Sequence, residues 1–192
     1  MPHLHPHAHP PVADASVRLA NPADASAIGS VQAHLWRDLY AGVLPEEVLA
    51  GFEARAFADV WASSLTSPPS GAHRALVACS GLEVVGFAAV GPSVDPDATD
   101  VDAEVLVLGV ESGSRRQGHG SRLVNAAADT ARGSGFGRLR AWVPQAASDP
   151  SELAVFLSSA GFEADGALRD RVVGPDDADL QHEIRVIATL PE

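Results

Sequence analysis

The chain has 192 residues, of which 46% are hydrophobic and 20% charged, and its mean hydropathy is +0.05, so composition and length suit one globular domain. Its 25 acidic residues outnumber 13 basic ones, giving a formal net charge of −12; this sign opposes contact with a phosphate backbone, so no nucleic-acid partner is expected. No apolar run approaches the ~20 residues that span a bilayer, and the N-terminus lacks a secretory-signal pattern, so no membrane partner is expected either. The only cysteine, Cys79, excludes an internal disulfide and suits the reducing cytoplasm, which is the expected location.

Residues 1–14 are predicted to form a disordered arm, and residues 15–192 a single domain. The arm alternates His with Pro and small residues (MPHLHPHAHPPV). Pro removes backbone donors, and the segment has too little apolar surface to pack against a core. A His-rich tract is able to bind metal, but the interpretation as a simple leader is favoured, and no metal site is predicted.

The rest of the chain alternates between helical and strand periodicity. Apolar residues recur at spacings of three and four after Asn21, which is a suitable helix cap. The predicted elements are a strand at 16–20, helices from Asn21 to a break at Gly42 and from Pro45 to a break at Pro68, strands at 73–79, 83–90 and 103–110, a helix at 119–131, a strand at 138–143, a helix at 151–160, and strands at 162–173 and 181–190. This order predicts a mixed α/β domain with seven strands and about four helices.

The segment VLVLGVESGSRRQGHGSRLVNAAA carries the most informative motif. A strand that is apolar on both faces ends at Val110, and Arg115-x-x-Gly118-x-Gly120 opens a helix. Glycines let the backbone approach a ligand closely, and the free N–H groups and dipole of a helix N-terminus favour an anion such as pyrophosphate. Two arginines add cationic donors. The predicted binding residues are Arg115, Arg116, Gln117, Gly118, His119, Gly120 and Ser121.

Two other phosphate-binding motifs do not fit this segment. A dinucleotide fingerprint requires Gly at position 123, where the chain has Leu123, and there is no Gly-Lys-Ser/Thr of a P-loop. An ordinary tight strand-to-helix turn is the remaining alternative, but such a turn does not need two arginines.

With this motif, the chain resembles the GNAT superfamily of N-acetyltransferases, whose acetyl-CoA pyrophosphate loop has the pattern R-x-x-G-x-G. Residues 34–49 (HLWRDLYAGVLPEEVL) are similar to a segment common between the family's first two strands, and residues 155–162 (VFLSSAGF) resemble its late F-Y-x-x-x-G-F segment. The resemblance implies a mixed seven-stranded sheet in which strands 103–110 and 138–143 splay apart, with acetyl-CoA as co-substrate. It also implies that the exposed backbone of Leu108 and Val110 binds the pantetheine arm and polarises the thioester carbonyl.

Glu104 is the candidate catalytic base. An amine attacks a thioester only as the free base, so its ammonium form must first lose a proton. The resemblance implies such a carboxylate near the start of the fourth strand, and period-two alternation predicts that Glu104 shares a face with Leu106 and Leu108. Burial on that face is expected to raise its pKa towards neutrality. A solvated glutamate at the strand end remains the alternative.

The acidic run before this strand (DPDATDVDAE) allows several interpretations. If the strand begins early, Asp100 and Asp102 share the face of Glu104, where they would attract a cation and raise its pKa by repulsion. A calcium loop is excluded, because Asp100 stands where Gly is needed and Leu106 where Glu is needed. A solvated acidic loop is the favoured interpretation.

Two further points concern the acceptor side. Leu157 stands where the family's F-Y-x-x-x-G-F segment has the tyrosine that protonates the leaving thiolate, so water would supply that proton. Trp36 and Tyr40 lie in the segment that roofs the acceptor site in the family, and they are candidates for the acceptor pocket, although packing in the core is favoured for both. His119 is expected to be a loop side chain.

The leading functional hypothesis is therefore an acetyl-CoA-dependent N-acetyltransferase that acts on a primary amine, in a small cationic molecule or in a protein or peptide, by direct attack in a ternary complex. The alternative is a weakly active or inactive acyl-CoA-binding sensor or structural module, and another acyl donor remains a third option. Many members of the family are homodimers, so a homodimer is compatible with the resemblance.

Overall fold

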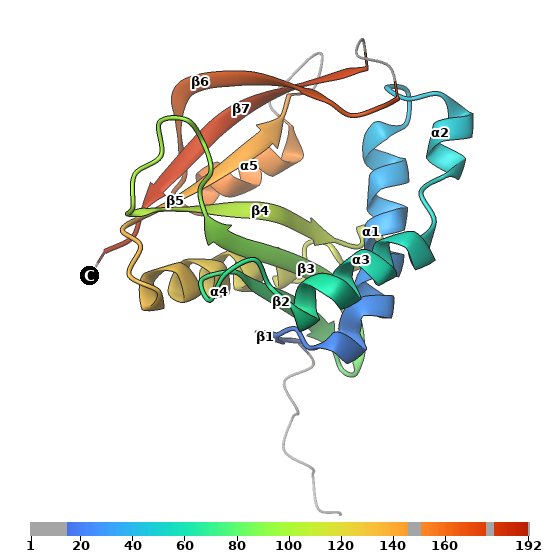
Figure 1. Cartoon of the computed structure of the whole chain (residues 1–192), viewed down its shortest axis with the longest axis horizontal. Helices are drawn as coiled ribbons and strands as arrows, with labels where there is room; N and C mark the ends of the chain where they lie inside the picture. The colour runs from blue at the N-terminus through green and yellow to red at the C-terminus, as the bar shows by residue number, and fades with distance from the viewer. Residues whose placement is uncertain (1–14, 146–150, 176–178, 192) are drawn as a thin grey trace, which may run out of the picture.

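The computed structural model describes residues 15–145, 151–175 and 179–191, so the predicted arm at 1–14 lies outside the described residues. One mixed sheet forms the centre of the molecule, with strand order β1-β2-β3-β4-β5-β7-β6 (Figure 1). The β4–β5 pair is parallel, and the other neighbouring pairs are antiparallel. The strands are β1 (Ala15–Leu19), β2 (Arg74–Ser80), β3 (Glu83–Pro92), β4 (Asp102–Val110), β5 (Arg138–Pro144), β6 (Glu163–Val172) and β7 (Leu180–Thr189).

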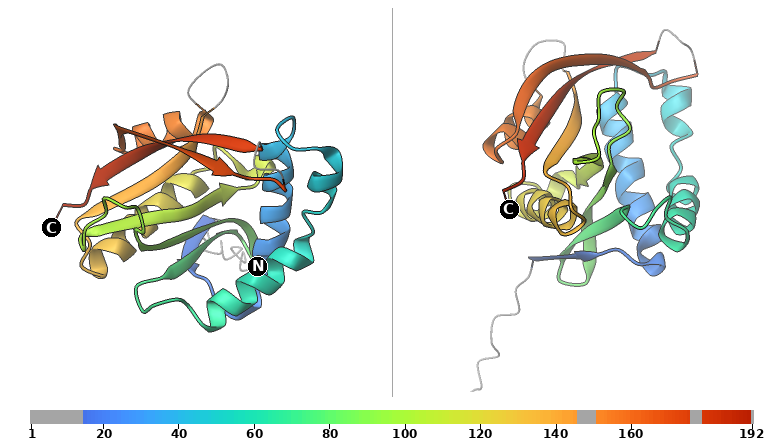
Figure 2. Two further views of the ribbon diagram at one scale, coloured as in Figure 1. Left: turned by 45° about the horizontal axis from the view of Figure 1, so that its top comes forward. Right: turned by 60° about the vertical axis from the view of Figure 1, so that its left-hand side comes forward.

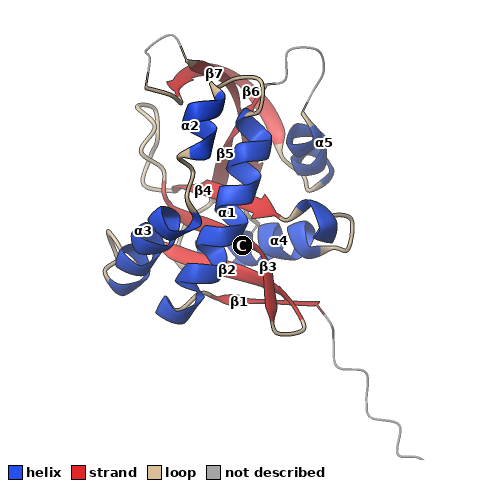
Figure 3. Ribbon diagram, turned by 90° about the vertical axis from the view of Figure 1, so that its right-hand side faces the viewer, coloured by secondary structure: helices blue, strands red, loops and turns tan. Residues whose placement is uncertain are grey.

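Helices cover both faces of this sheet, which confirms the predicted mixed α/β class. They are α1 (Ala25–Tyr40), α2 (Glu46–Ala50), α3 (Ala54–Thr66), α4 (His119–Gly133) and α5 (Glu152–Ser159). Figures 2 and 3 show α4 and α5 on one face, and α1 and α3 on the other face over β2 and β3. Each face has its own core: Leu123 and Leu157 belong to the first, and Ile28 and Phe87 to the second. None of the described helices is long and apolar enough to cross a membrane.

The segment predicted as one helix from Pro45 to Pro68 is two helices, α2 and α3, so the described chain has five α-helices rather than four. The cause is tertiary. Arg37 of α1 donates a hydrogen bond to the backbone oxygen of Phe52 (2.6 Å), and the Phe52 ring packs edge-on against Tyr40 and Phe57. These contacts hold Phe52 between the helices. The first predicted helix also begins later, because Asn21 caps a short 3-10 turn (Pro22–Asp24) that precedes α1.

The two central strands separate along their length. β4 and β5 pair from Asp102↔Arg138 to Val105↔Ala141, and no pairing is found between them beyond that point, although β4 continues to Val110 and β5 to Pro144. This confirms the predicted splay. The second half of β4 therefore has an open backbone edge on its β5 side.

A β-bulge in β4 places Glu104 and Leu108 on opposite faces of the sheet. Val90 of β3 pairs with Val105, but its neighbour Ala89 pairs with Val107, so Leu106 is an extra residue. Because a bulge shifts the alternation of side chains by one position, the predicted common face of Glu104, Leu106 and Leu108 is wrong. Leu108 packs against the first core together with Val105, and Glu104 lies on the opposite face.

On that opposite face, the loop at 93–101 is fixed to the sheet by ion pairs. Asp102 is fully buried; its carboxylate accepts hydrogen bonds from Arg138 (2.5 and 2.8 Å), Arg140 (2.8 Å) and Thr99 (2.8 and 2.9 Å). Burial opposes ionisation, but the hydrogen bonds from Thr99 and Arg138 outweigh it and lower the pKa of Asp102. Asp102 is thus committed to its arginines and does not serve as the free acidic group that the sequence allowed, while Asp100 is exposed.

We expect Asp102→Ala to destabilise the protein strongly. The substitution leaves the buried Arg140 guanidinium without this partner, which costs about 3–5 kcal/mol. The matched control, Asp100→Ala, removes an exposed carboxylate and should change the free energy of unfolding by less than about 0.5 kcal/mol. Urea denaturation of both variants measures the difference; equal stabilities would contradict the structural role of Asp102.

Candidate functional site

The loop after β4 offers a set of free backbone donors. A 3-10 turn (Ser112–Ser114) leads into Arg116 and Gly118, which both have positive φ (61° and 81°), and α4 then begins at His119. The first α-helical hydrogen bond runs from Arg122 N to Gly118 O (3.1 Å), and within the described part of the chain the amides of residues 116–121 donate no hydrogen bond. Such amides at a helix N-terminus form a suitable site for a phosphate group.

The two glycines of the motif are required by this geometry for different reasons. Gly118 has a left-handed φ, which would strain any residue with a Cβ. A Cβ at this position would also lie 2.8 Å from Nη1 of Arg122, which donates a hydrogen bond to the backbone oxygen of Gln117. A Cβ at Gly120 would lie 3.2 Å from Cζ of Phe156 in α5. Glycine at these positions keeps the backbone close to α5 and its amides accessible.

The side chains of the loop fall into two groups. Those of Arg115 and Arg116 are 49% and 92% exposed, and their contacts with Glu152 are long (3.6 and 3.9 Å), so both cations remain available to an anion. Ser121 is also exposed, and Gln117 donates to Gly113 O (3.2 Å). His119, in contrast, is the first residue of α4 and is 98% buried (2% exposed), with no partner for Nδ1 among the described residues. The expectation of a loop side chain is therefore wrong for His119, because it lies on the core face of α4, one turn before Leu123.

The open edge of β4 presents the backbone groups of Leu108 and Val110. Glu111 donates a backbone hydrogen bond to Val85 of β3 (2.9 Å). In an antiparallel ladder, hydrogen-bonded and non-hydrogen-bonded pairs alternate, so the N–H and C=O groups of Leu108 and Val110 point away from β3. They face the side on which pairing with β5 has ended, where the Val110 oxygen accepts a hydrogen bond from Nε of Arg115 (3.3 Å).

Glu104 lies where the two strands begin to separate, one residue before the last β4–β5 pair. It is 7% exposed, and Ser93 Oγ donates a hydrogen bond to its Oε2 (3.1 Å). Burial raises the pKa of Glu104, repulsion from Asp95 adds to this rise, and the Ser93 hydrogen bond and the charge of Arg169 oppose it. The carboxylate is therefore a stronger base than an exposed glutamate.

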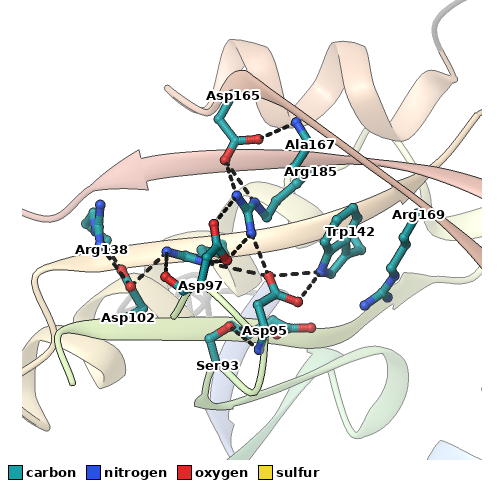
Figure 4. A network of polar contacts seen from close by, with 12 residues as sticks. Ser93, Asp95, Asp97, Asp102, Arg138, Trp142, Asp165, Ala167, Arg169 and Arg185 are labelled. Carbon is teal, nitrogen blue, oxygen red and sulfur yellow. Dashed lines mark hydrogen bonds and ion pairs between the residues drawn. The ribbon is translucent and has the colours of Figure 1, made fainter. Parts of the chain in front are cut away.

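Glu104 differs from the carboxylates around it in having no ion-pair partner within the described residues. Each of the others has at least one arginine nitrogen within 3.1 Å. Asp95, Asp97, Asp102 and Asp165 pair with Arg138, Arg140 and Arg185 (Figure 4). Glu183 pairs with Arg169 and Arg171. A buried unpaired carboxylate is costly for folding. Its presence at the opening of the splay marks it as a functional candidate.

The two aromatic candidates for the acceptor pocket occupy different environments. Trp36 packs against Phe57 and Phe87 in the second core, as the favoured interpretation predicted. Tyr40 is buried at the end of α1, and its hydroxyl accepts a hydrogen bond from Arg171 of β6 (2.9 Å). Tyr40 thus connects α1 with the charged face of the sheet, which is the face that carries Glu104 and the paired carboxylates and arginines named above.

A model of the acetyltransferase (GNAT) family matches residues 30–162, more than half of the chain. The chain belongs to this family. The activity class is therefore acetyl transfer from acetyl-CoA, and the free amides and the two glycines of the loop fit that donor. A comparison with curated protein sequences gives no match.

Solved structures share this GNAT fold at low sequence identity. The paiA N-acetyltransferase of Thermoplasma acidophilum, in complex with coenzyme A, is 16% identical, with a TM-score of 0.64 over 91% of this chain and 98% of that one. The yncA protein of Salmonella typhimurium, with acetyl-CoA, is 20% identical, with a TM-score of 0.61 over 93% and 95%. An N-acetyltransferase from Staphylococcus aureus Mu50 is 16% identical, with a TM-score of 0.64 over 93% and 100%.

Two further observations concern the acid position and possible metal ligands. Leu157, at the position of the family's tyrosine, is 1% exposed and belongs to the first core, so no acid group lies there. Within the described residues, no group of three or more His, Cys, Asp or Glu is arranged to hold a metal ion.

The sequence analysis missed the residues that surround Glu104 in this GNAT domain. Trp142 of β5 donates to Asp95 (2.9 Å), and Arg169 of β6 and Arg185 of β7 lie near its ring (Figure 4). The sequence does contain one signal of this polar face, because Arg138, Arg140 and Trp142 alternate with apolar residues in β5. It indicates a polar face, but not which carboxylates meet it.

We expect Gly118→Ala to weaken binding of coenzyme A by about tenfold. The left-handed conformation costs an L-residue about 1–2 kcal/mol, and relief of that strain moves the amides out of position. Gly113→Ala is the control, since it lies in the same loop with open space around its Cα and no positive φ. Calorimetric titration with coenzyme A measures both; equal affinities would contradict a role for this loop geometry.

Proposed function

We propose that the protein transfers an acetyl group from acetyl-CoA to a primary amine, with Glu104 as the base that deprotonates the amine. The observation that carries this proposal is Glu104 itself: among the described residues it is the one buried carboxylate without an arginine partner, and it lies where β4 and β5 separate. A raised pKa brings such a group closer to the value at which a general base is effective.

The donor side of the proposal rests on the loop and the open edge of β4. The amides of residues 116–121 and the guanidinium groups of Arg115 and Arg116 would hold the diphosphate, together with the exposed side chain of Ser121. The backbone of Leu108 and Val110 would hold the pantetheine arm in the splay. Acetyl-CoA, when bound, supplies the activated acetyl group.

In the proposed reaction, the ammonium group of the acceptor approaches Glu104 from the charged face and loses its proton to Oε1 or Oε2. Ser93 fixes the carboxylate by its hydrogen bond. The neutral amine then attacks the thioester carbonyl, which the free amides of β4 would polarise. As the C–N bond forms, the C–S bond breaks and coenzyme A leaves as the thiolate, while the nitrogen loses its extra proton to water and Glu104 returns its own proton to solvent. The thiolate takes its proton from water, because the position of the family's acid is Leu157 and a thiol has a pKa near about 8.5.

The core position of Leu157 also supports a second candidate, a CoA-binding module with little or no turnover. This candidate keeps the same diphosphate loop and needs no base. Turnover separates the two.

We expect Glu104→Gln to lower turnover by about 100- to 10,000-fold without weakening the binding of coenzyme A. In the parent protein, kcat/KM should rise with pH through the raised pKa of Glu104, because only the ionised carboxylate accepts a proton. Turnover is measured as the release of free thiol from acetyl-CoA in the presence of a panel of amines. Glu83→Gln, at an exposed position, is the control and should leave turnover unchanged. Coenzyme A binding with no turnover in the parent would favour the second candidate.

The same substitution should raise stability at alkaline pH. A carboxyl whose pKa is raised in the folded state stabilises folding below its ordinary pKa, and this contribution is lost as pH rises through the raised pKa. At pH 8 the buried charge is therefore unfavourable, and Glu104→Gln removes it. Urea midpoints should be higher for the variant at pH 8, with a smaller difference at pH 4; a lower midpoint at pH 8 would show that the charge is satisfied in the fold.

A further inference from the structure

Arg169 of β6 is held in a single orientation on the charged face by contacts on two sides. Its Nε donates to Oε2 of Glu183 (2.6 Å), a carboxylate that is 2% exposed. Its guanidinium carbon lies 4.3 Å from the centre of the Trp142 ring, and Trp142 is fixed in turn by its hydrogen bond to Asp95 (Figure 4). A guanidinium that stacks on an indole and is bonded through Nε has little freedom left.

The outer edge of this guanidinium is free. Nη1 and Nη2 of Arg169 donate no hydrogen bond within the described residues, and the side chain is 37% exposed. The two Nη groups carry four N–H donors, and one from each points outward in parallel, which is the geometry that binds a carboxylate through two hydrogen bonds.

The charges around Arg169 leave a positive excess. Glu183 is shared between Arg169 and Arg171 (2.6 and 3.0 Å), so two positive charges face one negative charge. Arg171, 44% exposed, also donates to the hydroxyl of Tyr40. Glu104 lies close to this excess by strand register: it pairs with Arg140 of β5, two residues before Trp142, on whose ring Arg169 stacks. In agreement with this placement, the charge of Arg169 lowers the pKa of the Glu104 carboxyl. The positive excess is local: Glu183 has two arginine partners, while the remaining carboxylates of this face outnumber the remaining arginines.

We propose that the acceptor is a zwitterion, an amine that also carries a carboxylate, as an amino acid does, and that the Nη edge of Arg169 binds this carboxylate while the amine meets Glu104. This inference rests on the proposed function and narrows its acceptor class. A plain polyamine would place a cation against the free guanidinium edge, which opposes its binding.

The test compares L-amino acids with their α-amides, in which a neutral group replaces the carboxylate. Acetyl transfer is followed by thiol release in the parent, Arg169→Gln and Arg169→Lys. The parent should prefer acids over amides in kcat/KM, and Arg169→Gln should reduce that ratio by about 10- to 100-fold, mainly through KM. Arg169→Lys keeps the charge but loses the fork, so it should restore only part of the ratio. Amino acids and their amides differ in the pKa of the amine. This difference cancels when the acid-to-amide ratio of kcat/KM is compared between the parent and a variant.

Arg132→Gln is the matched control, since Arg132 is also about 40% exposed and paired with a carboxylate, Asp129, but lies on α4. Its ratio should equal that of the parent. Thermal unfolding checks that Arg169→Gln remains folded, which is expected because Glu183 keeps Arg171 as a partner.

The outcomes separate this inference from the function on which it rests. An acid preference that survives Arg169→Gln, or transfer to amides and simple monoamines but not to acids, overturns the inference. If acetyl transfer to amides and simple monoamines is lost in Glu104→Gln, the proposed function stands and only the inference about the carboxylate fails. Binding of coenzyme A with no transfer to any amine contradicts both.

Discussion

The end of pairing between β4 and β5 after Val105–Ala141 is the constraint on which the candidate site depends. Up to that point the parallel ladder is closed, and the charged face and the first core are separated by continuous sheet. Beyond it, β4 keeps its ladder with β3 only, and its other edge is open to a ligand. The free amides before α4 follow directly at the end of β4, and Glu104 lies directly before the opening. One strand thus brings together the three parts of the proposed site, which are the loop with free amides, the open backbone edge and Glu104.

On the charged face, buried arginines are neutralised by carboxylates from the loop at 93–101 and from the start of β4. Arg140 and Arg185 are buried and could not be accommodated without carboxylates, and Asp95, Asp97 and Asp102 from the loop at 93–101 and the start of β4 supply them. Because a buried charge is tolerated when paired and hydrogen-bonded, these residues stabilise the loop over the sheet. Glu104 departs from this rule. It has no arginine partner among the described residues, which opposes folding, and under the proposed function this cost is accepted because it favours proton transfer.

The sequence was sufficient where the signal is local. The R-x-x-G-x-G pattern specifies a turn with positive φ and a helix that begins at His119, and strand boundaries from residue 73 onward were predicted within a few residues. The sequence was insufficient where the structure depends on contacts between residues that are far apart in the chain. The bulge at Leu106 arises from pairing with β3 and has no local marker, so Glu104 was assigned to the wrong face although its burial and the direction of its pKa shift were anticipated. Asp95 and Arg185 are 90 positions apart, and no periodicity connects them.

The most direct test of the central claim is an NMR titration of the ¹⁵N-labelled protein with coenzyme A, observing each backbone amide. The account predicts large shifts for the amides of residues 116–121 and for Leu108 and Val110, with smaller changes for Gly109, whose amide is directed to β3. Saturable binding that shifts amides elsewhere and leaves these unchanged would contradict the assignment of the splay and its loop as the donor site.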